Sequence, residues 1–120
     1  MNWIVKRIKS FGYAFAGIYR LFRHEANAQI HLLATIVVIS AGIYFQLRAL
    51  EWALVCLAIG VVIAAEAFNS AIEKLTDGMY PEKHDNAMHV KDMAAGAVLI
   101  AAIAAVAIAV FVFGGHLGLF

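Results

Sequence analysis

This chain has few of the residues that soluble, disulfide-bonded or nucleotide-loop proteins depend on. Its one cysteine, Cys56, excludes an internal disulfide and is expected to pack among apolar neighbours. Charged residues make up only 14% of the 120 residues, against about 25% in a typical soluble domain. The sequence contains no Walker-type glycine loop, zinc-ligand spacing or nucleophile elbow. No cleaved signal peptide and no nucleic-acid partner are expected.

Apolar residues dominate instead, and they fall into three long runs. They make up 64% of the chain, and about 20 such residues in a row are enough to cross a bilayer as a helix. We therefore predict an all-α membrane protein with a single domain over residues 1–120. Its transmembrane helices are expected at about 26–47, 52–73 and 93–115. A tight outer turn is predicted at Arg48–Glu51, and a break at Asp77–Pro81, which holds the only proline.

Residues 2–23 are predicted to form an amphipathic helix on the membrane surface. Six large apolar residues recur at steps of three and four, which places them on one helical stripe: Ile4, Ile8, Phe11, Phe15, Ile18 and Phe22. The basic residues lie mostly off this stripe, so the helix is expected to rest on anionic headgroups with its apolar face down. A plain topology signal would explain the charges but not the regular spacing.

The distribution of Lys and Arg gives the expected orientation. Basic residues are concentrated before the first span, and Lys74, Lys83 and Lys91 lie between the second and third, whereas none follows Asp92. Cytoplasmic segments carry the excess of Lys and Arg. The N-terminus and the 74–92 segment are therefore predicted to be cytoplasmic and the C-terminus outside, in a bacterial inner membrane.

A polar stripe begins inside the second predicted span and continues beyond its end. At a helical 100° per residue, Glu66, Asn69, Glu73 and Asp77 share one face. An acid at the centre of a bilayer costs about 2.5–3.5 kcal/mol to insert, so Glu66 is expected to have a function. Hydrogen bonding between helices is the structural alternative for Glu66, Asn69 and Glu73 together, and simple solvation is the alternative for Glu73 or Asp77 taken alone.

Counting helical rise places several carboxylates at the cytoplasmic interface. A helix that starts at Trp52 reaches this level near Glu73, the first span begins beside Glu25, and the third begins after Asp92. Glu66 lies about 10 Å deeper, by seven residues of rise. Carboxylates at the interface suit Mg²⁺ bound together with phosphate oxygens. A separate, deeper acid suits proton transfer from a lipid hydroxyl.

The histidines carry weaker signals. His84 and His89, in a polar segment over 82–92, are interpreted as solvated. His31 is interpreted as a cap or an interfacial pair, and His116, near the end of the sequence, as uninformative.

One stretch of the sequence resembles a known family. Glu66-Ala-Phe-Asn-Ser-Ala-Ile-Glu-Lys-Leu-Thr-Asp77 resembles the E-x-x-N-[ST]-A-I-E-x-x-x-D signature of the small bacterial integral-membrane lipid kinases. These are the prokaryotic diacylglycerol kinases and their undecaprenol kinase relatives. The likeness covers nearly the whole chain, including Lys91-Asp92-Met-Ala-Ala-Gly-Ala-Val. It implies a homotrimer with sites shared between subunits, and transfer of the γ-phosphoryl group of MgATP to a lipid hydroxyl without a P-loop.

The resemblance also implies roles for individual residues. Glu66 would be the catalytic base, and Glu25 and Glu73 would bind Mg²⁺. The nucleotide-binding residues that it implies are Tyr13, Gly17, Asn69, Asp77, Glu82, His84, Lys91 and Asp92. Undecaprenol is the expected lipid alcohol, because Ile30-His31-Leu32-Leu33 looks like the undecaprenol kinase branch. His31 and Phe15 also stand where Glu and Trp are expected in proteobacterial diacylglycerol kinases.

Three other interpretations are compatible with these residues. Diacylglycerol is the alternative substrate of a kinase. A proton- or cation-coupled carrier would use Glu66 and Asn69 as an intramembrane relay, although the outer half of every predicted span lacks the polar groups that a carrier needs. A non-catalytic assembly subunit would use the polar stripe only to pack helices.

Overall fold

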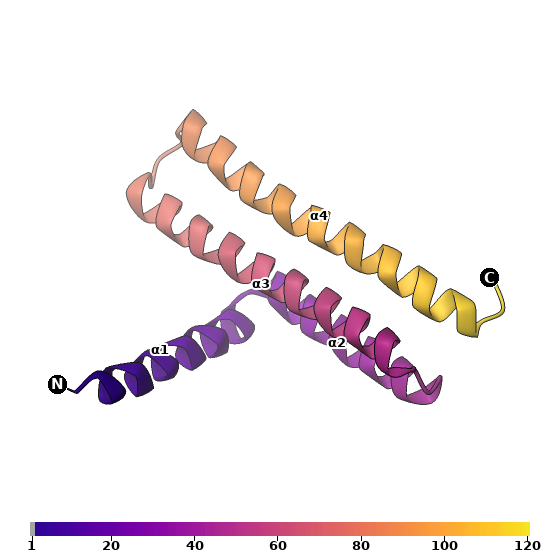
Figure 1. The fold of residues 1–120 in the computed structure, drawn as a ribbon. Helices are drawn as coiled ribbons and strands as arrows, with labels where there is room; N and C mark the ends of the chain where they lie inside the picture. Colours follow the sequence, from indigo (N-terminus) through magenta and orange to yellow (C-terminus); the bar gives the residue numbers. More distant parts are fainter. Residues whose placement is uncertain (1) are drawn as a thin grey trace.

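Four α-helices make up most of the chain in the computed structural model, which describes residues 2–120. They are α1 (Trp3–His24), α2 (Ala26–Tyr44), α3 (Ala49–Met79) and α4 (Asp85–His116). α3 and α4 lie side by side and antiparallel, α2 runs back along part of α3, and α1 points away from the α3–α4 pair (Figure 1). No strand forms within residues 2–120. The predicted architecture, a surface helix followed by three apolar helices, is confirmed.

α2, α3 and α4 are each long and apolar enough to cross a membrane. α3 has 31 residues and α4 has 32, so each is about 45 Å long, against about 30 Å of hydrocarbon in a bilayer. The polar ends of both helices therefore extend beyond the apolar layer. Many large apolar residues are exposed, among them Phe68, Leu99 and Phe111, as expected for surfaces that face lipid or another subunit.

The buried interior of the single chain is small and lies near the α2–α3 turn. Leu47, Val55 and Val112 form its centre, and Trp52 packs against them. A Cβ atom on Gly42 would lie only 2.6 Å from the Trp52 indole. The missing side chain at Gly42 therefore lets the start of α3 pack directly against the end of α2.

The α2–α3 turn falls at 45–48, which is earlier than the predicted turn at Arg48–Glu51. Glu51 belongs to the first turn of α3, where its Oε1 accepts a hydrogen bond from the Arg48 backbone N–H at 3.1 Å. Gln46, with a φ of 54°, turns the chain.

The α3–α4 connection is shorter than predicted. α3 continues through Gly78 to Met79 and ends just before Pro81, because proline rather than glycine is incompatible with a continuing helix. α4 begins at Asp85, so most of the polar segment over 82–92 is helical and the helix starts before the predicted third span at 93. The cause is His84, whose Nδ1 accepts a hydrogen bond from the Ala87 backbone N–H at 3.3 Å and caps the helix.

Glu25 separates α1 from α2. Its backbone is extended (φ −100°, ψ 115°), and its side chain makes no capping hydrogen bond to α2. Gln29 holds the bend, because its Nε2 donates to the Phe22 carbonyl oxygen at 3.1 Å. The Glu25 carboxylate is therefore left free to interact with α3.

Candidate active site

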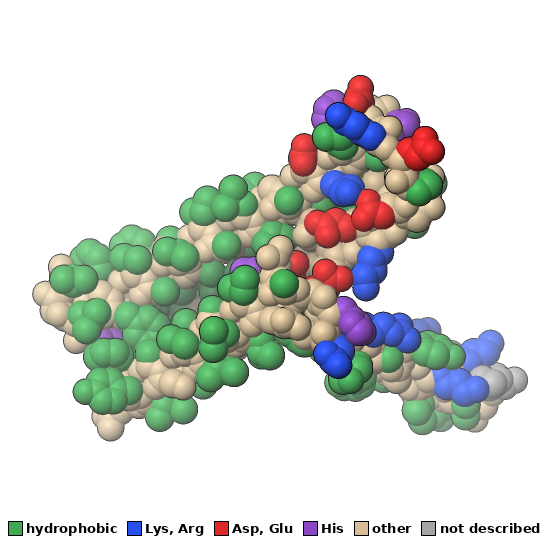
Figure 2. Space-filling view, turned by 180° about the vertical axis from the view of Figure 1, so that it is seen from behind, with side chains coloured by type: hydrophobic (Ala, Val, Ile, Leu, Met, Phe, Trp, Pro, Cys, Tyr) green, Lys and Arg blue, Asp and Glu red, His purple; other side chains and the backbone are tan. Residues whose placement is uncertain are grey.

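Charged side chains gather at one end of the molecule. Figure 2 shows acidic, basic and histidine side chains over the adjoining ends of α3 and α4 and along α1, while most of the opposite end is covered by hydrophobic side chains. The polar residues of the predicted site come from α1, the α1–α2 bend, α3 and α4.

Glu66 lies at the inner edge of this region, in the apolar part of α3. It is the most deeply buried large side chain in the described residues, with 2% of its surface exposed. Its Oε1 accepts a long hydrogen bond from the Ser70 hydroxyl at 3.5 Å, whereas its Oε2 is buried without any hydrogen-bond partner. His31 Nε2, from α2, lies 3.9 Å from that oxygen, which is beyond hydrogen-bond distance.

Asn69 and Glu73 form the next turn of the polar stripe. Asn69 Nδ2 donates to Glu73 Oε1 at 3.2 Å, and Asn69 Oδ1 is buried with no partner. Leaving a buried acceptor unpaired costs about 1–3 kcal/mol. Interhelical hydrogen bonding alone, the structural alternative, therefore leaves two buried oxygens of this stripe unexplained.

Glu25 faces α3 from the bend between α1 and α2. Its Oε1 lies 3.5 Å from Lys74 Nζ, in an ion pair that is mostly exposed on the lysine side. Glu73 lies two helical turns beyond Glu66 on the same face of α3. Three carboxylates from two separate elements thus face one region.

Asp77 and Lys91 connect the ends of α3 and α4. Lys91 Nζ donates to Asp77 Oδ1 at 2.8 Å. Both residues lie outside the apolar stretches, beyond 52–73 and before 93–115. The hydrogen bond and the negative charge of Asp77 raise the pKa of Lys91, so this amine stays protonated beside the site.

A cavity of about 160 Å³ opens beside this ion pair. Four of the predicted nucleotide-binding residues line it: Asp77, Glu82, His84 and Lys91. The Tyr80 ring stacks on the His84 ring at a centroid distance of 4.5 Å. The helix ends thus bring together residues that are apart in the sequence.

Four other predicted nucleotide-binding residues do not line this cavity, among them Asn69 on the polar stripe. Tyr13 is 74% exposed, and a Cβ atom added to Gly17 would meet no neighbouring side chain or helix within 4 Å. Both lie on α1, which Figure 1 shows pointing away from the α3–α4 pair. Asp92 is exposed near the start of α4.

The oxygen atoms in this region suit a hard divalent cation. Carboxylates of Glu25 and Glu73 and the unpaired amide oxygen of Asn69 are the ligand types that Mg²⁺ prefers. No group of three His, Cys, Asp or Glu side chains in residues 2–120 is placed to hold a metal ion. Because Mg²⁺ is usually bound by one or two carboxylates plus phosphates and water, two carboxylates fit a nucleotide-bound ion.

Several contacts could not be anticipated from the sequence. Nothing in the sequence predicted the site contacts of Lys74 and Tyr80, although the charge of Lys74 contributed to the predicted orientation. His116, interpreted as uninformative, makes a structural contact: its Nε2 lies 2.9 Å from Glu51 Oε2 and joins the far ends of α3 and α4. His31, interpreted as a cap or an interfacial pair, lies opposite Glu66, with its Nε2 3.9 Å from Oε2.

The chain is similar to known lipid kinases over nearly its whole length. The family described as "Prokaryotic diacylglycerol kinase" matches residues 12–113. The undecaprenol kinase of Bacillus subtilis is 35% identical over 112 residues, covering 93% of this chain and 91% of that protein. The diacylglycerol kinase of Escherichia coli K12 is 30% identical, covering 92% and 91%. A diacylglycerol kinase of Synechocystis is 40% identical over 98 residues, covering 81% of this chain and 56% of that protein.

Proposed function

Because the chain belongs to the prokaryotic diacylglycerol kinase family, and is therefore a membrane-bound, ATP-dependent lipid kinase, we propose that it phosphorylates undecaprenol. Transfer takes place from MgATP at the cytoplasmic face of a bacterial inner membrane. The observation that carries the proposal is the buried, unpaired Glu66 Oε2 beside the carboxylates at the helix ends. The similarity to a protein named undecaprenol kinase supports the choice of lipid.

Glu66 accepts the proton of the lipid hydroxyl. Its Oε2 has no competing donor, so it is free to accept a hydrogen bond from a substrate O–H, and a positioned carboxylate of this kind typically contributes 10²–10⁴-fold to the rate. Ser70 fixes the other carboxylate oxygen. The depth of Glu66, below the end of α3, matches a hydroxyl that approaches from the membrane.

The residues at the helix ends bind the nucleotide and its metal ion. Asp77, Glu82, His84 and Lys91 line the cavity beside them, and Lys91 supplies a positive charge for phosphate oxygens. Glu25, Glu73 and Asn69 would hold Mg²⁺. When bound, this ion neutralises charge on the phosphates that react.

A homotrimer would complete the site. Tyr13 and Gly17, which the family resemblance assigns to nucleotide binding, lie on α1 and do not line the cavity of their own chain. Asp92 is also exposed. A neighbouring subunit can supply these residues, with the N-terminus in the cytoplasm and the C-terminus outside.

Diacylglycerol remains the second candidate substrate, because relatives of similar coverage carry the name diacylglycerol kinase. Purified protein in mixed micelles with labelled ATP and Mg²⁺ distinguishes the two when each lipid alcohol is supplied separately. We expect transfer to undecaprenol in preference to diacylglycerol. Label on neither lipid would refute the proposal.

Glu66→Gln tests the base. The variant should lose about 10²–10⁴-fold in kcat while keeping its affinity for ATP, because the nucleotide cavity lies at the helix ends. Ser70→Ala serves as a control that removes only one hydrogen bond to Glu66. Normal turnover in Glu66→Gln would show that Glu66 is not the proton acceptor.

A further inference from the structure

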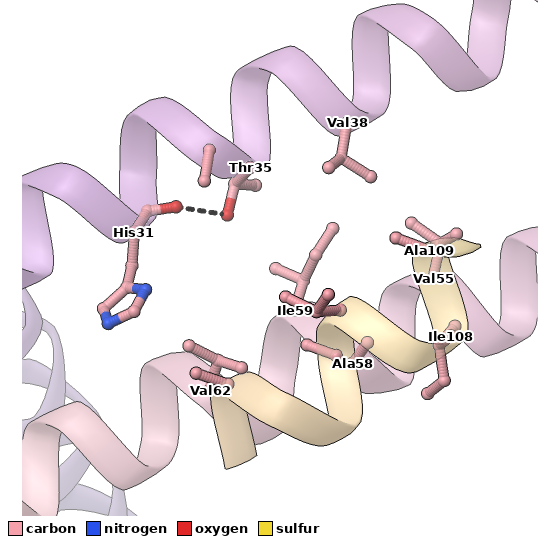
Figure 3. A pocket seen from close by; sticks show the side chains of 13 residues that line it. His31, Thr35, Val38, Val55, Ala58, Ile59, Val62, Ile108 and Ala109 are labelled. Atoms are coloured by element: carbon pink, nitrogen blue, oxygen red, sulfur yellow. Dashed lines mark hydrogen bonds between the residues drawn. The ribbon is translucent and has the colours of Figure 1, made fainter. Parts of the chain in front are cut away.

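A second, larger cavity lies between α2, α3 and α4 in the apolar part of the molecule. Its volume is about 260 Å³. Figure 3 shows His31 at one end and Ile108 and Ala109 at the other, with Val62 and Ala58 along one wall. The walls are aliphatic apart from His31 and Thr35. Within residues 2–120, the backbones of α2 and α4 do not approach each other closely, so the two helices leave this space between them.

The cavity has one polar end. The Thr35 hydroxyl donates to the His31 backbone carbonyl at 2.8 Å, so it is already satisfied within α2. The His31 ring is the remaining polar group in the wall. Glu66 follows Val62 by one helical turn on the same face of α3, which places the unpaired Glu66 Oε2 just beyond the His31 end.

The spacing between His31 Nε2 and Glu66 Oε2 suits a hydroxyl that bridges them, and because Oε2 is closed to water, the two side chains must part slightly to admit it. Nε2 and Oε2 are 3.9 Å apart, too far for a direct hydrogen bond. One oxygen atom placed about 2.8 Å from each of them would make two hydrogen bonds of ordinary length. It would also satisfy the Glu66 oxygen that has no partner.

We propose that the apolar cavity seats the first hydrocarbon units of a prenyl alcohol, and that His31 and Glu66 hold its hydroxyl between them. This inference rests on the proposed kinase function and adds His31 as a second catalytic residue. An apolar cavity of about 150 Å³ takes up benzene, so a volume of about 260 Å³ accommodates roughly ten carbon atoms. That corresponds to about two isoprene units next to the hydroxyl.

The chemistry of the walls favours a prenyl alcohol over diacylglycerol. A prenyl alcohol has hydrocarbon directly next to its single oxygen. Diacylglycerol has two ester groups close to its hydroxyl, and their carbonyl oxygens would be buried against aliphatic walls without a donor, which is unfavourable. A site of this kind discriminates against a substrate whose polar groups it leaves unpaired.

His31 orients the hydroxyl in the transfer step. With the Nε2–H tautomer, His31 donates to the hydroxyl oxygen while the hydroxyl proton points to Glu66 Oε2. The oxygen forms a bond to the γ-phosphorus, and the proton moves to Glu66. The bond between the γ-phosphorus and the oxygen that links it to the β-phosphorus of ATP breaks, and the electron pair of this bond leaves with ADP.

Substitution of His31 tests its contact with substrate. We expect His31→Leu to lower kcat/KM for undecaprenol by about 10²-fold, the usual effect of removing a positioned donor at a reacting oxygen. His31→Gln, which keeps an N–H donor, should recover part of this loss, and binding of ATP should not change. His89→Leu is the matched control, because His89 is exposed on α4. Activity of His31→Leu within threefold of the unsubstituted protein would overturn the role of His31.

Filling the cavity tests whether it binds the hydrocarbon part of the lipid alcohol. Ala105 lines the cavity and Ala107 does not, although both lie on the same stretch of α4. We expect Ala105→Phe to raise KM for undecaprenol about tenfold or more, and Ala107→Phe to leave it unchanged. Equal effects of the two substitutions would overturn the assignment. So would loss of oligomeric state in Ala105→Phe with unchanged lipid kinetics, because the cavity would then belong to a subunit contact.

Assays of the unsubstituted protein distinguish a failure of the proposed kinase function from a failure of the cavity assignment. If it phosphorylates neither undecaprenol nor diacylglycerol, the proposed function fails. If it phosphorylates diacylglycerol with a higher kcat/KM than undecaprenol, it remains a lipid kinase and the prenyl alcohol assignment of the cavity is wrong.

Discussion

Replacing Lys74 by Met should tighten the binding of a divalent cation in the absence of nucleotide. Lys74 Nζ lies 3.5 Å from Glu25 Oε1, and the lysine side chain is 61% exposed. An ion pair of this exposure contributes about 0.2–1 kcal/mol, which corresponds to a factor of roughly 1.4 to 5 in an equilibrium constant. A cation that takes the Glu25 carboxylate must displace the ammonium group. Removing Lys74 should therefore increase the affinity by up to about fivefold.

Binding of Mn²⁺ to the detergent-solubilised protein, followed by electron paramagnetic resonance, measures this affinity without turnover. Lys74→Arg keeps the charge and should bind Mn²⁺ about as weakly as the unsubstituted protein. Lys83→Met removes one positive charge from the α3–α4 connection, away from Glu25, and controls for the general change in charge.

A double-mutant cycle with Glu25→Gln separates competition from general electrostatics. Once the Glu25 charge is gone, Lys74→Met should no longer improve Mn²⁺ binding beyond the effect of Lys83→Met. An equal improvement with and without the Glu25 carboxylate would refute the competition, as would unchanged or weaker binding in Lys74→Met alone.

Three further predictions concern packing, the far end of the molecule and the metal. Gly42→Ala should destabilise the protein by about 1–3 kcal/mol in thermal unfolding, because its Cβ would meet Trp52 at 2.6 Å. Gly60→Ala, which has open space around it, should not destabilise the protein. Equal losses of stability in the two variants would contradict the packing argument. His116→Leu should lower the melting temperature by removing the 2.9 Å contact to Glu51, while the folded variant keeps its rate of lipid phosphorylation; a loss of rate without a loss of stability would contradict this. Removal of Mg²⁺ with a chelator should abolish phosphoryl transfer, and activity that survives chelation would remove the metal role of Glu25 and Glu73.

The helices were predictable because their signals are local. Long apolar runs and the three- and four-residue spacing over 2–23 depend only on neighbouring residues. Helix ends were less predictable. The start of α4 depends on His84, which is not one of the usual capping residues, and Gly78 proved compatible with α3.

The contacts of the site were harder to predict than its residues. Spacing alone places Glu66, Asn69 and Glu73 on one face, and the Asn69–Glu73 hydrogen bond follows from it. The Glu25–Lys74 pair and the His116–Glu51 pair join residues far apart in the sequence. Such pairs depend on how each helix is rotated about its own axis, which the pattern of a single sequence does not determine.

The arrangement of one chain also gives a physical reason to expect a neighbouring subunit at the site. Phe68 and Leu75 are 71% and 64% exposed, and at a helical 100° per residue they lie on the face of α3 opposite Glu66. Apolar side chains of this size are expected to contact lipid or another subunit, whereas Glu66 and Asn69, at 2% and 4% exposed, are already shielded from water within one chain. The α1 helix of the same chain points away from the α3–α4 pair (Figure 1). In the proposed homotrimer, α1 of a second copy would bring Tyr13 and Gly17 to the adjoining ends of α3 and α4, whereas Glu25 already faces Lys74 of its own chain, so two chains would share one catalytic centre.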